Sequence, residues 1–243
     1  MLTQNQIGVL YMVGSVICFS IMDICVKWLD YYPVGQVLFL RFFIGFIPIF
    51  FIIPKDKLFS FYKTTRPGLH AFRAICGALA IIALFYGLRE LPLADVVSLT
   101  FGGPIFVTVA SIFFLSEKVG IKRWSAVFLG FIGMLLIVQP AFIDLNYYYI
   151  SPIIFCIFFA CVAISVRSLS KTEANYTIAF YFTLLCTIIG LSSIFFVDWI
   201  MPTKIDLLIF VIMALCGSIA NLLLTQSYRL AEASLVTPIK YLS

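Results

Sequence analysis

Long apolar runs are the feature that most limits what this chain can fold into. Eight stretches of mainly apolar residues follow one another, and each has about the 20 residues that a helix needs to cross a bilayer. None alternates in polarity as the strands of a membrane barrel do. The runs are 7–29, 34–53, 69–88, 94–115, 122–139, 148–169, 176–197 and 205–228. A ninth run starts near Glu232 and continues to Ser243.

Composition supports a membrane location. The chain is 63% hydrophobic and 11% charged, whereas a soluble domain is nearer half apolar and a quarter charged. That much apolar surface cannot be hidden inside a water-soluble domain of 243 residues, so part of it must face lipid. We therefore expect an all-α polytopic membrane protein. The first run holds Asp23 and Lys27 and follows a segment without Lys or Arg, so we interpret it as a spanning helix and not as a signal peptide.

Several functional classes are not indicated. The net charge of +5 comes from short clusters of cations between the apolar runs, so it predicts no nucleic-acid partner. The seven cysteines all lie inside apolar runs without a C-x-x-C pair, and His70 is the single histidine. The sequence thus predicts no disulfide framework, no metal site and no cofactor.

Basic residues set the expected orientation. With a cytoplasmic N-terminus, eleven cations fall in loops on the cytoplasmic side and three on the outer side, which agrees with the positive-inside rule. The eleven are Lys55, Lys57, Lys63, Arg66, Arg73, Lys118, Lys122, Arg123, Arg167, Lys171 and Arg229. The three are Lys27, Arg89 and Lys204. We expect a multi-pass protein of the cytoplasmic (inner) membrane with its N-terminus in the cytoplasm.

One stretch of the chain occurs twice. "CGALAIIALFYGLR" from Cys76 and "CGSIANLLLTQSYR" from Cys216 lie 140 positions apart, and six of 16 aligned pairs are identical over 74–89 and 214–229. Each copy would contain five spans. Because five is odd, the second copy enters the membrane from the opposite side. The four cations at 55, 57, 63 and 66 are accordingly replaced by Phe, Val, Thr and Asp 140 positions later.

Inverted repeats of this kind are typical of secondary transporters, whose site lies between the two copies. We expect a first repeat at 1–140 and a second, incomplete repeat at 141–243. A complete second copy would end near position 280, so the second repeat is expected to be truncated in its fourth helix.

The order of several motifs resembles a known family. "RFFIG" (41–45), "RPGLHAFRAICGALAIIALFYGLRELPLADVVSLTFGGPIFVTVAS" (66–111), "LSEKVGIKRWSAVFLGFIGMLLIVQP" (115–140) and "SYRLAEASLVTPIKYLS" (227–243) are similar to the EamA-domain branch of the drug/metabolite transporter superfamily. Within it, "RFF", "RP..H..R" and "RW.....GFIG" are similar to S-adenosylmethionine uptake carriers. The resemblance implies ten helices in two inverted five-helix repeats with a substrate cavity between them.

Polar groups inside the spans are the first candidates for a site. A charge near the bilayer centre costs at least about 2.5–3.5 kcal/mol and should face a cavity or the bundle interior. Asp23 and Lys27 share one helix face at i, i+4 spacing. Arg41 lies at a similar depth on the next helix, so an Asp23–Arg41 pair is expected, either as part of the site or as a packing contact. Arg73 enters the third span from the inner side and can equally be an interfacial anchor.

Interrupted helices in matching spans are the best pointer to a transporter's site. The fourth span is broken by glycine and proline, and a proline also lies in the ninth. The expected interruptions are Gly102, Gly103, Pro104 and Pro238. Beside them, or on the repeated stretch, lie the further cavity candidates Tyr86, Thr100, Gln226, Lys240 and Tyr241. Simple kinks for packing are the competing explanation.

The sequence therefore predicts a secondary transporter that moves a small polar or amphipathic metabolite by alternating access. Two alternatives stay open. One is a non-transporting fragment or membrane scaffold. The other is a membrane enzyme, for which the chain offers no set of acid, base, nucleophile or metal ligands. The expected partners are a small-molecule solute and the lipid bilayer, and assembly into a homodimer is left open.

Overall fold

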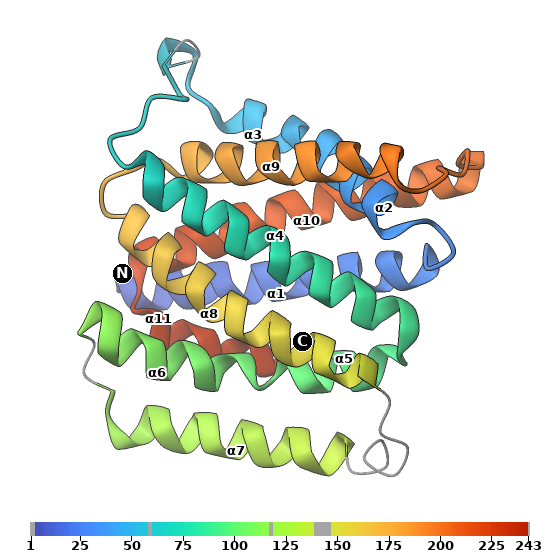
Figure 1. Ribbon diagram of the computed structural model, residues 1–243. Helices are drawn as coiled ribbons and strands as arrows, with labels where there is room; N and C mark the ends of the chain where they lie inside the picture. The colour runs from blue at the N-terminus through green and yellow to red at the C-terminus, as the bar shows by residue number, and fades with distance from the viewer. Residues whose placement is uncertain (1–2, 58–59, 117–118, 139–146, 243) are drawn as a thin grey trace.

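A computed structural model describes residues 3–57, 60–116, 119–138 and 147–242. Every regular element in these ranges is helical (Figure 1). The α-helices are α1 (Gln4–Trp28), α2 (Val34–Ile44), α3 (Phe46–Ile52), α4 (Pro67–Glu90), α5 (Leu93–Thr100), α6 (Gly103–Leu115), α7 (Ile121–Val138), α8 (Ile150–Leu169), α9 (Asn175–Ser192), α10 (Lys204–Leu230) and α11 (Ala233–Val236). Short 3₁₀ helices are η1 (Lys55–Lys57), η3 (Tyr147–Tyr149), η4 (Ser193–Phe195) and η5 (Thr237–Leu242).

Within the described residues, seven helical segments are long and apolar enough to cross a membrane. They are Gln4–Trp28, Val34–Ile52, Pro67–Glu90, Leu93–Leu115, Tyr147–Leu169, Asn175–Phe195 and Lys204–Leu230. Large apolar side chains also cover the outer surface, with Phe51, Phe113 and Phe195 each more than three-quarters exposed. A surface of this kind is suited to lipid. The expectation of an all-α polytopic membrane protein is confirmed.

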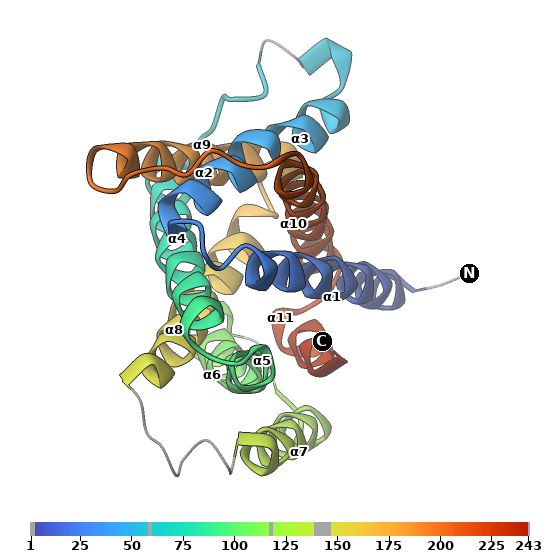
Figure 2. The same cartoon turned by 90° about the vertical axis from the view of Figure 1, so that its right-hand side faces the viewer.

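The main helix pairs each join a helix from the first part of the chain to one from the second part. α1 lies against α10, α4 against α8, and α2 against α9, so each pair joins the first part of the chain to the second (Figures 1 and 2). α5, α6 and α7 lie together on one side of the bundle (Figure 2). The C-terminal segment η5 packs against α1, α6 and α7. Together these three pairs place six helices around the middle of the molecule.

Small residues allow α2 and α9 to approach closely. A Cβ atom on Gly190 would lie 2.5 Å from the backbone nitrogen of Phe39, a distance that only glycine tolerates. Small residues at helix contacts have this role in membranes, where packing replaces the hydrophobic drive between helices. Next to this contact Phe42 and Phe182 meet edge to face, with ring centroids 5.1 Å apart. We call this ring pair the aromatic floor: Phe182 lines the central cavity, and Phe42 contacts Arg41, which also lines it.

The cations at the ends of α1 and α8 have matching contacts. Lys27 Nζ donates to the backbone oxygens of Arg89 and Leu91, each at 3.3 Å, at the end of α4. Arg167, 140 positions after Lys27, donates to the backbone oxygens of Tyr228 and Arg229 at the end of α10. A cation at a helix C-terminus satisfies free carbonyls and stabilises the helix dipole. Both side chains therefore tie two helix ends together.

Two polar clusters join the chain at opposite ends of the bundle. In the Asp206 cluster, at the start of α10, Tyr32 and Thr203 donate hydroxyl hydrogen bonds to Asp206 Oδ2 at 2.9 and 2.6 Å. In the Glu173 cluster, between α8 and α9, Glu173 Oε1 accepts hydrogen bonds from Thr64 and Thr65. Because α1 and α4 both begin at the left in Figure 1, the Glu173 cluster lies at that end and the Asp206 cluster at the other.

Candidate functional site

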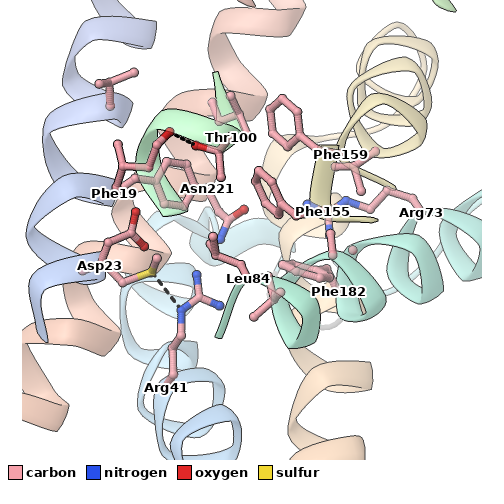
Figure 3. A pocket seen from close by; sticks show the side chains of 18 residues that line it. Phe19, Asp23, Arg41, Arg73, Leu84, Thr100, Phe155, Phe159, Phe182 and Asn221 are labelled. Atoms are coloured by element: carbon pink, nitrogen blue, oxygen red, sulfur yellow. Dashed lines mark hydrogen bonds between the residues drawn. The ribbon is translucent and has the colours of Figure 1, made fainter. Parts of the chain in front are cut away.

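A cavity with about 830 Å³ of empty space, counting the part open to the outside, lies at the centre of the helices (Figure 3). Side chains from α1, α2, α4, α5, α8, α9 and α10 form its wall, so both parts of the chain contribute. The lining residues are Val16, Phe19, Met22, Asp23, Arg41, Arg73, Gly77, Ala80, Ile81, Leu84, Val97, Thr100, Phe155, Phe159, Val162, Phe182, Asn221 and Leu224.

Two buried arginines are the main polar feature of this wall. Arg41 and Arg73 are 1% and 2% exposed. The Arg41 guanidinium carbon lies 4.2 Å from the centroid of the Phe42 ring, and that of Arg73 lies 3.8 Å from the centroid of Phe182. Each guanidinium therefore lies within cation–π range of one ring of the aromatic floor. This contact helps to position both charges.

Asp23 is the one acidic residue among the described lining residues. It lies on α1 and points into the same space as Arg41 (Figure 3). The two opposite charges face one cavity and interact electrostatically, while the Arg41 Nε atom contacts the Met22 sulfur at 3.1 Å. A direct Asp23–Arg41 pair stays a prediction.

The interruption of the fourth span borders the cavity. α5 ends at Thr100 and α6 begins at Gly103, with Pro104 in its first turn. Thr100 lines the cavity, and its hydroxyl donates to the backbone oxygen of Val97 at 2.7 Å. The thiol of Cys156 lies 3.6 and 3.7 Å from the backbone oxygens of Leu99 and Thr100. The thiol of the neighbouring helix α8 thus contacts the two carbonyls at the break, of which the Leu99 oxygen also accepts a backbone hydrogen bond from Gly102.

The remaining candidates lie elsewhere. The described lining does not include Lys27, which binds carbonyls at the end of α4, nor Tyr86, which is 48% exposed. It also does not include Gln226, which accepts a hydrogen bond from Asn175. Pro238 lies in η5 directly after the short helix α11. The backbone of η5 also contains residues 240 and 241, but the side chains of Lys240 and Tyr241 lie outside what the structure describes.

The sequence leaves two interpretations of Arg73 open, a site residue or an interfacial anchor, and the structure places it more than a turn inside α4, which begins at Pro67. Two kinds of lining residue were not among the candidates from sequence. Asn221 stands among apolar residues in the middle of α10, and this isolated polar position was a usable signal. The lining residues Phe155, Phe159 and Phe182 are three of 26 phenylalanines, and no sequence signal separates them from phenylalanines that face lipid.

Curated relatives of similar sequence are membrane transporters. The chain is 27% identical to a riboflavin transporter of Rhizobium johnstonii, an alignment that covers 97% of this chain and 79% of the relative. It is 25% identical to an S-adenosylmethionine uptake transporter of Rickettsia bellii, covering 99% and 82%. It is 26% identical to the pseudopaline exporter CntI of Pseudomonas aeruginosa, covering 97% and 83%.

A solved crystal structure shares the fold, with a TM-score of 0.79 over 97% of this chain and 83% of that one, at 15% sequence identity. The family model described as "EamA-like transporter family" matches residues 6–139, which is more than half of the chain. The helices and central cavity of this chain, and the relatives to which it is similar, agree with that match. The chain is a small-molecule membrane transporter and belongs to the EamA-like transporter family.

Proposed function

We propose that this protein moves a small polar or amphipathic metabolite across the cytoplasmic (inner) membrane by alternating access. The observation that carries the proposal is a central cavity lined by helices from both parts of the chain, with a polar cluster at each end of the bundle. A carrier needs a site near the middle of the membrane and closures on both sides of it. The N-terminus is proposed to lie in the cytoplasm, as the loop charges predict.

The two clusters support a symmetric mechanism. Tyr32 follows α1 and meets Asp206 at the start of α10, while Glu173 follows α8 and meets Thr64 and Thr65 before α4. With a shift of 140 positions, these are equivalent loops of two copies of one unit. The contacts of Lys27 and Arg167 correspond in the same way. We therefore propose inverted repeats at 1–140 and 141–243, with one cluster opening while the other stays closed.

A transport assay tests this function. The full chain is reconstituted into proteoliposomes, and uptake and efflux of riboflavin, S-adenosylmethionine and pseudopaline are followed as first probes, since relatives are named for them. Ala80 lines the cavity and Leu79 beside it is 42% exposed. We expect Ala80→Phe to block transport and Leu79→Phe to leave it unchanged. Equal activity of both variants would contradict a route through this cavity.

No catalytic function is proposed, because the relatives and the family are transporters. The solute and the bilayer are the partners that the proposal needs. Nucleic acid has no part in it, and a homodimer is not required because the cavity is formed within one chain.

A further inference from the structure

The two cavity arginines have hydrogen-bonding groups that no group in the described part of the chain satisfies. Both Nη atoms of Arg41, and Nε and Nη1 of Arg73, are buried without a hydrogen-bond partner. Buried polar groups are nearly always paired in proteins, so each exception needs an explanation. A buried guanidinium with unpaired N–H groups is especially costly, because the hydrogen bonds that it loses with water are not replaced. Four unpaired nitrogens on two residues that line one cavity therefore point to a ligand that supplies acceptors.

Each guanidinium is held beside an aromatic ring. The Arg41 Cζ atom lies 4.2 Å from the Phe42 ring centroid, and the Arg73 Cζ atom lies 3.8 Å from the Phe182 ring centroid. The N–H groups of a guanidinium lie in one plane, and this planar fork can bind a carboxylate or phosphate through two parallel hydrogen bonds.

The charge of the lining also favours an anion. Among the described lining residues, two are cationic and one, Asp23, is acidic. Charges interact more strongly in a membrane interior than in bulk water, so this excess attracts an anionic group. Phe155 and Phe159 form a stacked pair, with ring centroids 5.5 Å apart, on the α8 side of the same cavity (Figure 3). Flat apolar groups pack well against such rings.

We propose that Arg41 and Arg73 together bind a carboxylate or phosphate of the transported molecule, while a flat apolar part of that molecule lies against Phe155 and Phe159. The substrate class is thus an amphipathic organic anion. This inference rests on the proposed transport function and specifies what the cavity recognises.

Binding to the full chain in lipid nanodiscs tests the anion site with two matched pairs of probes. Flavin mononucleotide and riboflavin differ by a phosphate, and 4-phenylbutyrate and 4-phenylbutyramide differ by a carboxylate charge. We expect the anionic member of at least one pair to bind at least tenfold more tightly, and the pair that shows this identifies the anion. Absence of a preference in both pairs would overturn the proposal.

Variants separate charge recognition from folding. Arg41→Gln and Arg73→Gln should each weaken binding of the preferred anion at least tenfold while leaving its neutral partner within threefold. Lys55→Gln, which removes a cation from the exposed helix η1, is the matched control and should change neither. Equal loss of anionic and neutral probes in the arginine variants would show a structural role and contradict the site.

A measurement without any probe gives a second test. If the arginines are kept for a ligand, the empty protein tolerates their loss, since replacing an uncompensated buried charge by an apolar group of similar size is often neutral or stabilising. Arg41→Met and Arg73→Met should therefore unfold at or above the wild-type temperature in detergent. A clear fall in both would assign the arginines to packing. Wild-type transport of the neutral probes without anion preference would refute this inference but not the proposed function, whereas no transport of any probe would refute both.

Discussion

The glycines of the repeated stretch should be intolerant of a single added carbon. Gly77 and Gly217 lie 140 positions apart, each after a cysteine. A Cβ atom on Gly77 would come within 2.6 Å of Cε2 of Phe182 and 3.3 Å of Nη1 of Arg73. A Cβ atom on Gly217 would lie 2.9 Å from Nε of Arg41. Each glycine thus leaves room for a side chain of the arginine–aromatic floor.

The magnitude follows from two opposing effects. Exchange of glycine for alanine in a helix interior stabilises by about 0.5–1 kcal/mol. Forcing an extra carbon into a packed contact costs about 1–3 kcal/mol. The Phe182 ring cannot bend away from Gly77, so Gly77→Ala should lose about 1–2 kcal/mol net. The flexible Arg41 chain can shift from Gly217, so Gly217→Ala should lose at most about 1 kcal/mol. That shift nonetheless moves the guanidinium.

Gly133 in α7 provides the control, since nothing lies within 4 Å of a Cβ atom built there. Gly133→Ala should therefore gain about 0.5–1 kcal/mol. Equilibrium unfolding in mixed micelles ranks the unfolding free energies of the three variants. Binding of the preferred anion then reports whether Arg41 has been displaced. The reasoning fails if Gly77→Ala is as stable as Gly133→Ala, or if Gly217→Ala binds that anion like the wild type.

Three further outcomes are expected. Glu173→Gln should loosen its end of the bundle, so that a cysteine at Thr64 reacts faster with a water-soluble maleimide, and an unchanged rate would contradict a closing role. Burial alone would raise the pKa of Glu173, but hydrogen bonds from the Thr65 backbone and from the Thr64 and Thr65 hydroxyls hold this pKa below its usual range. This stabilisation is therefore fully present above the unfolded-state pKa of about 4.3 and is lost as the pH falls through the lower folded-state pKa. The difference in unfolding free energy between the wild type and Glu173→Gln should therefore shrink in acid. A constant difference down to pH 3 would refute this. In a background without native cysteines, Asn5→Cys should react from the cytoplasmic side and Tyr31→Cys from outside, and the reverse pattern would invert the proposed orientation.

Sequence patterns predicted the spanning helices well because crossing a bilayer leaves few choices. A run of about twenty apolar residues must be helical to satisfy its own backbone in lipid. The break of the second span at Gly45, between α2 and α3, was not predicted. Glycine is frequent in membrane helices and marks a break only through its tertiary neighbours.

The composition of the cavity was harder to predict, because helical periodicity fixes which residues share a face but not what that face meets. Asp23 and Lys27 share one face of α1, yet Asp23 lines the cavity while Lys27 binds the end of α4. The position of Arg41 inside the second membrane span could be predicted from the sequence. That Arg73 lies on the same aromatic floor depends on the contact between Phe42 and Phe182, which joins α2 to α9 and has no local signature.

The proposed repeat is uneven at the cavity, and the unevenness has a consequence for the substrate. The positions that match Arg41 and Arg73, 140 residues later, are Tyr181 and Met213, so both cavity arginines belong to the first part of the chain. The stacked pair Phe155 and Phe159 belongs to the second. In the proposed repeats, the cationic and aromatic groups of the cavity therefore come from different copies. A carrier that accepted a symmetric or uniformly polar solute would have no use for this division, whereas an amphipathic anion would be held in one orientation throughout the transport cycle.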